Sequence, residues 1–344
     1  MAPASSLKIV QTAQFSRLRR RLHELDSSLK IVPAALNYLH NTAPDEGLDH
    51  HVGAAVNALQ NPWWNKHGAL RGSRQLIIEA RRRLIALFLI DGMAAFENYV
   101  VDLVYAHLTV RPRAVTAQWI SDKHRSQRPK FSVHNHTPPA NHPKGHRLEC
   151  CAAAAKEWSR KVPATARMQA FPYMIQGGGD LSTALPFRLF EYARTARNAV
   201  AHDDSVVSLE FAQASQHCDL RGEESRLSAR TTDVPELPKF SAGDAVRIEP
   251  EHLVMLFTVL RRTAAAYDKM FLASLTQHEE LDYLAATFVA YPNTTRKSNQ
   301  ASRDFTALAR KYLGLKKATE RQIIEGLRSH PQAQAIRAMH SNCV

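Results

Sequence analysis

The chain is poor in cysteine. Its 344 residues include only four, at Cys150, Cys151, Cys218 and Cys343. They show no framework spacing, and neighbouring cysteines such as the first two seldom bridge each other. This pattern excludes a disulfide-stabilised scaffold, and we expect reduced thiols.

Long hydrophobic runs are also missing. A transmembrane helix needs roughly 18 uninterrupted apolar residues, whereas the best run, residues 84–90, ends at Asp91. Near the amino end, Arg17 and the arginines at 19–21 occupy the place where a secretory signal has its apolar part. We therefore expect a cytoplasmic protein with no membrane association.

Alternating strand patterns are scarce as well, and apolar residues recur at helical spacing. With 44% hydrophobic residues, the chain can bury a full core. We predict a mostly α fold, a helical bundle. Its helices are expected at residues 7–39, as two helices broken at Pro33, at 74–108, at 148–161, from Pro186 to about Asp204, and at 251–275.

The helix expected over residues 74–108 carries an apolar stripe along its length and is the natural spine of the bundle. The following residues, 111–147, are rich in histidine and proline, lack periodicity and are interpreted as an insertion. The chain then divides into an N-terminal helical segment (1–70), a helical domain (71–275) that includes the insertion and a polar connector (205–245), and a basic helical C-terminal region (276–344).

An excess of positive charge gathers in two segments. The net charge is +13 and the pI is near 9.8. Residues 111–147 contain eight lysines or arginines against one acidic residue, and residues 291–344 contain ten against three. This distribution favours a polyanionic partner. A solvated surface is the alternative for either segment taken alone.

One short segment combines three residue types that act on phosphates. Arg197, Asn198 and His202 lie late in the helix that is expected to open at Pro186. Arginine stays cationic and offers several donors to phosphate oxygens. Histidine changes its charge near neutral pH and can take or give a proton. The segment is therefore our candidate catalytic motif.

The spacing of this arginine and histidine proves little by itself, because it occurs twice. Arg247 and His252 repeat it, with Pro250 inside the interval. A proline at that position makes the second pair straddle a loop and the start of a helix rather than lie within one helix. The second pair serves as an internal control.

Helical geometry places the motif on more than one face. Glu191, Thr195, Asn198 and His202 follow one polar stripe at about 100° per residue. Arg197 lies about 140° from His202 in projection, so one helix does not present both side chains well to one phosphate. Two copies of the helix, brought together by a two-fold axis, remove this problem. We expect a homodimer with a composite active site.

The run from Arg197 to His202 resembles the R-N-x-x-x-H signature of the HEPN superfamily, whose active members are mostly ribonucleases of prokaryotic toxin and antiphage systems. Glu97 and its aromatic neighbours are similar to an acidic stretch in the first long helix of RiboL-PSP-like and related branches. The resemblance implies a HEPN-type helical bundle and an active site at the homodimer interface. Asp204 replaces a tyrosine that many toxin members carry, so regulation by nucleotidylation at that position is not expected.

The expected chemistry is RNA cleavage without a metal or other cofactor. We assign His202 to proton transfer at the ribose 2′-hydroxyl or the leaving 5′-oxygen, Arg197 to the phosphate, and Asn198 to orienting the histidine or the phosphate. Because the nucleophile belongs to the substrate, we predict an RNA product with a 2′,3′-cyclic phosphate. Supporting roles are expected for Glu97, Glu191, Thr195 and Asp203.

Basic and aromatic side chains are expected to hold the RNA, mainly from the insertion. The predicted contacts are Arg194, Lys123, Arg125, Arg128, Lys130 and Trp119. Because uncontrolled cleavage of RNA harms a cell, we also expect an antitoxin or another subunit of a defence system as a partner.

Several alternatives stay open. Arg197 and His202 can be structural residues that satisfy carboxylates such as Glu97 or Asp102. The chain can be a catalytically silent RNA-binding or adaptor protein, or a DNA-binding regulator that uses its C-terminal region. The histidines of the insertion, with Cys150 and Cys151, are a weaker zinc alternative because their spacing matches no compact structural site.

Overall fold

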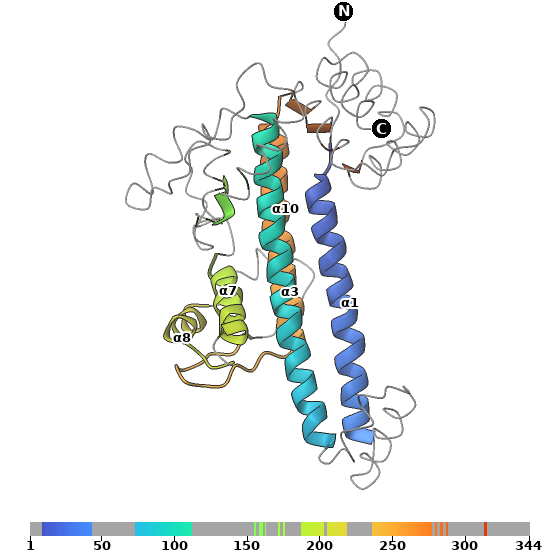
Figure 1. Ribbon diagram of the computed structural model, residues 1–344, viewed down its shortest axis with the longest axis vertical. Coiled ribbons are helices and arrows are strands. Elements are labelled where there is room, and N and C mark those ends of the chain that lie inside the picture. Colours follow the sequence, from blue (N-terminus) through green and yellow to red (C-terminus); the bar gives the residue numbers. More distant parts are fainter. Residues whose placement is uncertain are drawn as a thin grey trace, which may run out of the picture. The chain divides into compact units, whose positions relative to one another are not determined.

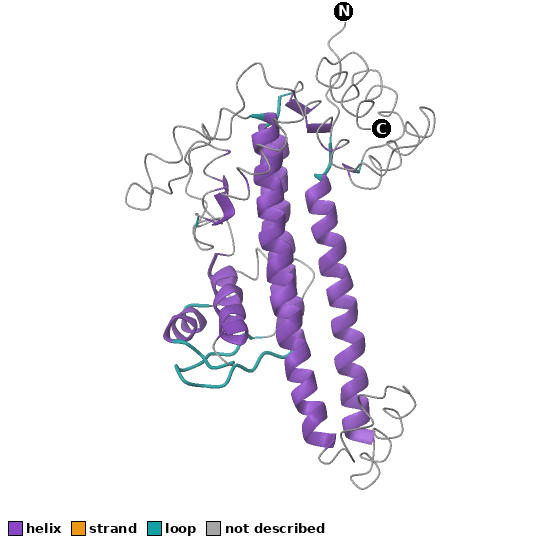
Figure 2. Cartoon of the chain, viewed as in Figure 1, coloured by secondary structure: helices purple, strands orange, loops and turns teal. Residues whose placement is uncertain are grey.

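The computed structural model describes residues 9–42, 73–111, 187–202, 205–218 and 236–276, together with 155, 158–160, 162, 171–172, 175, 279–280, 283–284, 287 and 313–314. Its named helices are α1 (Ala13–Thr42), α3 (Ser73–Val110), α7 (Phe187–His202), α8 (Leu209–Gln216) and α10 (Pro250–Ser274) (Figure 1). Helices and loops account for all the coloured residues in Figure 2. The predicted mostly α fold is confirmed for this part of the chain.

Helix α1 runs through Pro33 without a break, so the predicted break there is wrong. A proline inside a helix is unfavourable by about 3 kcal/mol because it removes a backbone donor and crowds the preceding turn. Pro33 is itself buried, however, and extends the buried stripe of Leu22, Leu25 and Leu29. Burial of large apolar side chains, at roughly 1.5–3 kcal/mol each, outweighs the unfavourable proline.

Helices α3 and α10 follow the sequence pattern closely. The helices predicted at 74–108 and 251–275 are observed as Ser73–Val110 and Pro250–Ser274. Their apolar stripes form much of the core, as expected from residues that recur every three or four positions. These buried side chains are Ile85, Leu89, Met93, Phe96, Val100 and Val104 of α3 and Phe257, Leu260, Ala264, Tyr267 and Phe271 of α10.

Over Ile77–Val110, α3 is long and apolar enough to cross a membrane by length and composition. The buried core helix of a helical bundle has the same length and apolar composition, so these two properties are weak evidence for a membrane span. Two acidic residues of α3 pair with α1: Asp91 with Arg21, and Asp102 with Arg17 at 3.5 Å. Such pairs are typical of a helix whose neighbours are other helices of the same chain.

Contacts divide the chain into two compact units that are each built from separated stretches of sequence. Unit 1 comprises Met1–Arg20, Ala95–Phe187 and Arg261–Val344, and unit 2 comprises Arg21–Ala94 and Arg188–Leu260. Each of the three long helices is divided between the units, with one part in unit 1 and the other part in unit 2. These helices are α1, α3 and α10. The three domains expected as continuous ranges of sequence stay a prediction.

Asp268 of α10 holds the N-terminal end of α1 in unit 1. The backbone N–H of Thr12 donates to both carboxylate oxygens of Asp268, at 3.2 Å for Oδ1 and 3.0 Å for Oδ2. The Thr12 hydroxyl also donates to Oδ1 of Asp268. The next N–H, of Ala13, donates to the hydroxyl of Tyr283 at 2.9 Å. Burial raises the pKa of Asp268 to about 6, although the hydrogen bonds from Thr12 act in the opposite direction.

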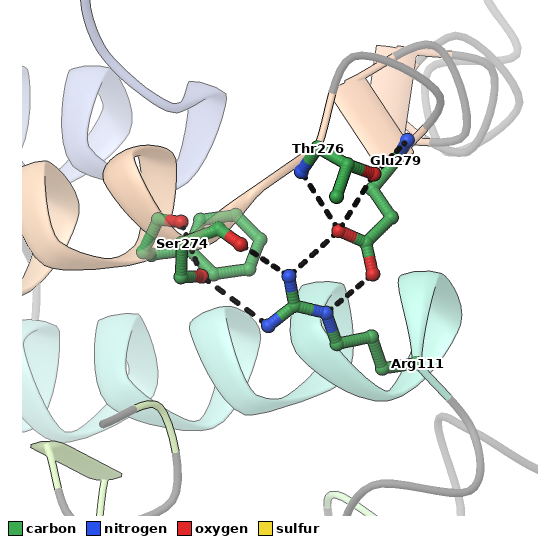
Figure 3. A network of polar contacts seen from close by, with 5 residues as sticks. Arg111, Ser274, Thr276 and Glu279 are labelled. Atoms are coloured by element: carbon green, nitrogen blue, oxygen red, sulfur yellow. Dashed lines mark hydrogen bonds and ion pairs between the residues drawn. The ribbon is translucent and has the colours of Figure 1, made fainter. Parts of the chain in front are cut away.

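A polar clamp joins the end of α3 to the end of α10 in unit 1 (Figure 3). Arg111 donates to both carboxylate oxygens of Glu279 and to the last carbonyl of α10, on Ser274. Glu279 also accepts from the N–H of Thr276 at 2.8 Å and donates its own N–H to the Thr276 hydroxyl at 3.3 Å. This reciprocal pattern is a capping box, so one carboxylate serves both the box and the arginine.

Unit 2 contains a close approach between α3 and α10. A Cβ atom added to Gly92 would lie 2.3 Å from Cε1 of Phe257, whose ring is fully buried. Only glycine leaves room for the aromatic ring at this position. Gly92 therefore sets how closely the two helices pack.

The predicted polar connector over residues 205–245 is more ordered than expected, because it contains α8. Ser208 caps this helix by accepting from the N–H of Phe211, at 3.2 Å. The Phe211 ring packs between Tyr192 and Phe240, with both pairs of ring centres 5.2 Å apart. These contacts bury one face of α8 against α7.

Candidate functional site

Helix α7 forms because one of its faces is apolar and finds partners in unit 2. It begins one residue after Pro186, as expected for a proline near the first turn, and ends at His202. The predicted apolar stripe is buried at Leu189, Ala193 and Ala196. The whole motif from Arg197 to His202 thus lies on one helix, in its last two turns.

The three candidate catalytic residues have different environments. Arg197 and Asn198 are half-buried, and His202 is exposed as the last residue of the helix. Nη1 of Arg197 donates to Oδ1 of Asn198 at 3.0 Å. The amide therefore orients the guanidinium, one of the groups expected to contact the phosphate.

The control pair has the arrangement expected from its proline. Arg247 lies in the loop before α10, and His252 lies in the first turn of that helix. Nδ1 of His252 accepts from the N–H of Glu249 at 3.0 Å, which makes it a capping residue. The prediction that this pair straddles a loop and a helix start is confirmed.

The two supporting residues on α7 are engaged within the helix. The Thr195 hydroxyl is buried and donates to the carbonyl of Glu191 at 2.7 Å, with a second contact to the carbonyl of Tyr192 at 3.2 Å. The Glu191 carboxylate accepts from Arg194. The predicted polar stripe therefore becomes more exposed along the helix, from buried Thr195 to exposed His202.

Arg194 was expected to contact RNA, but its guanidinium is buried and held by two carboxylates. Its Nε and Nη2 donate to Oε2 of Glu191 at 3.0 and 2.8 Å, and Nη2 also donates to Glu210 of α8. Burial lowers the pKa of Arg194, but the hydrogen bonds with both glutamates outweigh that effect and raise it. Arg194 thus serves packing between α7 and α8 in this structure.

The chain beyond α7 is tied back to the helix. Ser205 adopts a positive φ of 63° and donates its N–H to the carbonyl of Ala199 at 3.1 Å. It also accepts from the N–H of Val246 at 2.8 Å, and Val207 donates to the carbonyl of Asp244 at 2.8 Å. The last two bonds form an isolated antiparallel bridge between Val206 and Ala245, which begins three residues after His202, the end of α7.

Comparison with protein-family models, curated proteins and solved structures finds no match. The HEPN assignment therefore stays a prediction that rests on the motif. The fold alone is compatible with it, since a helical bundle serves many functions.

The two carboxylates that were alternative partners for the motif, Glu97 and Asp102, both lie on α3 in unit 1. Glu97 is half-buried. Asp102 pairs with Arg17 at 3.5 Å, and burial raises the pKa of Asp102 while Arg17 lowers it. Asp102 thus has an arginine partner on α1.

Several predicted residues lie outside the described part of the chain. They are Asp203, Asp204, the insertion residues Trp119, Lys123, Arg125, Arg128 and Lys130, and the histidines and adjacent cysteines of the zinc alternative. Among the described residues, Cys218 is buried as a reduced thiol.

Sequence reasoning missed Glu210, which lies in the first turn of α8 and closes the contact with Arg194. Its signal is present in the sequence. Ser208 precedes an acidic residue and then the apolar Phe211, which is a typical start of a helix. Recognition of that start predicts a helix within the connector.

Proposed function

We propose that this protein is a metal-independent endoribonuclease that acts as a homodimer and serves as the toxic effector of a defence or toxin–antitoxin system. The observation that carries the proposal is the arrangement at the end of α7. There, an amide orients Arg197, and His202 is exposed at the last residue of the helix. A cation and a proton-transfer group at one accessible end of a helix suit phosphodiester cleavage.

The chemistry follows from these side chains. Arg197 binds the non-bridging phosphate oxygens, whose negative charge grows in the transition state. His202, as neutral imidazole, removes the proton of the 2′-hydroxyl, and a second imidazolium protonates the leaving 5′-oxygen. The 2′-oxygen attacks phosphorus, the bond to the 5′-oxygen breaks, and the products are a 2′,3′-cyclic phosphate and a 5′-hydroxyl. A homodimer supplies both histidines.

The proposal is tested with purified protein and total RNA, in the presence and absence of EDTA. We expect the wild type to cleave RNA equally in both conditions and His202→Ala to lose cleavage by at least about a hundredfold, the usual contribution of acid–base catalysis. His217→Ala is the matched control, because His217 is also exposed at a helix end. Equal cleavage by wild type and His202→Ala would end the proposal. Loss of activity in EDTA would end its metal-free mechanism.

The same preparation separates the other two classes of function. RNA binding without cleavage identifies an adaptor, and a shift of duplex DNA that survives His202→Ala identifies a regulator. Mapping of cleavage ends distinguishes a cyclic phosphate product from a 3′-hydroxyl. If this protein is expressed in cells together with the partner that restrains it, we expect the cells to be protected from its toxicity.

A further inference from the structure

We propose that Arg194, held between Glu191 and Glu210, is a positioning residue that fixes where His202 lies. The catalytic meaning of this inference rests on the proposed function. Its geometry rests on contacts of α7 and α8 alone. We refer to Arg194, Glu191 and Glu210 as the α7–α8 clamp.

The clamp is asymmetric in its exposure. The Arg194 side chain is 9% exposed and that of Glu191 is 19% exposed, whereas that of Glu210 is 64% exposed. Arg194 is thus a buried cation with one carboxylate on its own helix and a second on α8. Of the two ion pairs of Arg194, the one with Glu210 links α7 to α8, beside the packing of Phe211 on Tyr192.

The position of the clamp along the chain explains its effect on His202. Sixteen residues separate Arg194 from Glu210, and His202 lies between them at the end of α7. The last turn of a helix has carbonyls without intrahelical partners and frays readily. Here Ser205 holds that turn through its bond to Ala199, and the clamp holds the preceding part of α7 to α8.

A purely structural role for Arg194 makes a different prediction from a positioning role. If Glu210 is removed, Glu191 still neutralises Arg194, so no buried charge is left without a counterion. An ion pair with a mostly exposed partner contributes little to stability. Removal of Glu210 therefore leaves the fold intact, since Phe211 still packs on Tyr192, but it removes the polar contact that fixes Arg194 of α7 to α8.

The experiment compares Glu210→Ala with Glu251→Ala in cleavage assays. Glu251 is the matched control. Like Glu210, it is exposed and is the second residue of its helix, but it lies on α10 and is not part of the α7–α8 clamp. We expect Glu210→Ala to lower kcat about tenfold with KM changed less than about twofold, since misplacement of a catalytic group slows chemistry without loss of binding. Glu251→Ala is expected to match the wild type. Equal kcat values for the two variants overturn the inference.

A second variant guards against a folding defect. Glu210→Gln keeps an oxygen that accepts from Arg194 but removes the charge, so we expect partial recovery of kcat relative to Glu210→Ala. Thermal melts of both variants are compared with the wild type. If Glu210→Ala does not fold, Glu210→Gln carries the comparison: its kcat is then expected to lie below that of Glu251→Ala, and equal values overturn the inference.

A readout without substrate separates this inference from the proposed function. The imidazole resonances of His202, assigned by their loss in His202→Ala, are recorded in the wild type and in Glu210→Ala. We expect them to shift, while those of His23 on α1 stay unchanged. Unshifted His202 resonances overturn the positioning role even if the protein cleaves RNA. Shifted resonances in a protein that does not cleave RNA reject only the proposed function.

Discussion

At the scale of single residues, Asn198 illustrates how a contact selects between roles. From the sequence alone, the Asn198 amide is predicted to orient either His202 or the phosphate. In the structure its oxygen accepts from Arg197, on the preceding residue. A guanidinium that is already oriented loses less conformational entropy when it binds a phosphate. The structure thus associates the amide with Arg197, the residue proposed to bind the phosphate.

We expect Asn198→Ala to lower kcat/KM about tenfold, because Arg197 is no longer oriented toward the phosphate. Steady-state cleavage of a labelled RNA oligonucleotide measures this ratio. Gln213→Ala, which removes an exposed amide from α8, is the control and should match the wild type. An unchanged ratio for Asn198→Ala contradicts the orienting role.

Asp268 makes stability depend on pH. Its pKa is raised from 3.8 to about 6 by burial, which corresponds to roughly 3 kcal/mol. Because the folded pKa lies above the unfolded one, the stabilising contribution is complete below about pH 4 and is lost as the pH rises through about 6. Relative to Asp268→Asn, the wild type should lose up to this amount between these limits. Urea unfolding at several pH values tests this, and a constant difference between the two proteins refutes it.

At the scale of helices, prediction from the sequence was accurate for long helices whose buried residues recur at regular spacing. Helices α3 and α10 repeat apolar residues over six or more turns, so their ends were predicted within a few residues. The eight-residue α8 was missed because it is too short for a periodic signal and depends on packing against Tyr192 and Phe240. The break at Pro33 was predicted wrongly because local propensity yielded to burial.

Gly92 offers a test of helix packing. Alanine in a helix is favoured over glycine by about 1 kcal/mol, but overpacking a core is unfavourable by about 1–3 kcal/mol. Since the added Cβ would lie 2.3 Å from the buried Phe257 ring, we expect Gly92→Ala to destabilise unit 2 by about 1–2 kcal/mol. Denaturant midpoints measure the loss. A double-mutant cycle with Phe257→Leu should show favourable coupling, and a Gly92→Ala protein as stable as wild type contradicts the close packing.

At the scale of the whole molecule, the proposed dimer is tested by mixing subunits. His202→Ala should be inactive by itself. If one active site needs His202 from both chains, a one-to-one co-refolded mixture of wild type and His202→Ala retains about a quarter of wild-type activity, because mixed dimers are inactive. Active sites that each lie within one chain retain about half of it. RNA cleavage by the mixture, compared with the wild type refolded alone at the same total protein concentration, distinguishes the two cases.

The sequence was sufficient to select the residues of the candidate site, but not to predict which side chains contact the residues around it. Arg197, Asn198 and His202 were chosen from one continuous segment, where helical spacing is informative. The partner of Arg194 on α8 and that of Asp268 at the start of α1 are set by tertiary packing, since the latter contact spans 256 residues of sequence. No local pattern carries information on such distant partners, so the contact of Arg194 with Glu210 is visible only in the structure, and its predicted contact with RNA stays a prediction.

The Arg111 clamp also bears on how the ends of α3 and α10 respond to acid. The hydrogen bonds from Arg111 and from Thr276 lower the pKa of Glu279 from 4.5 to about 2, although its partial burial acts in the opposite direction. The carboxylate therefore keeps its charge, and the clamp its ion pair, until the pH falls toward 2. The two helix ends stay joined in acid that already protonates ordinary surface carboxylates.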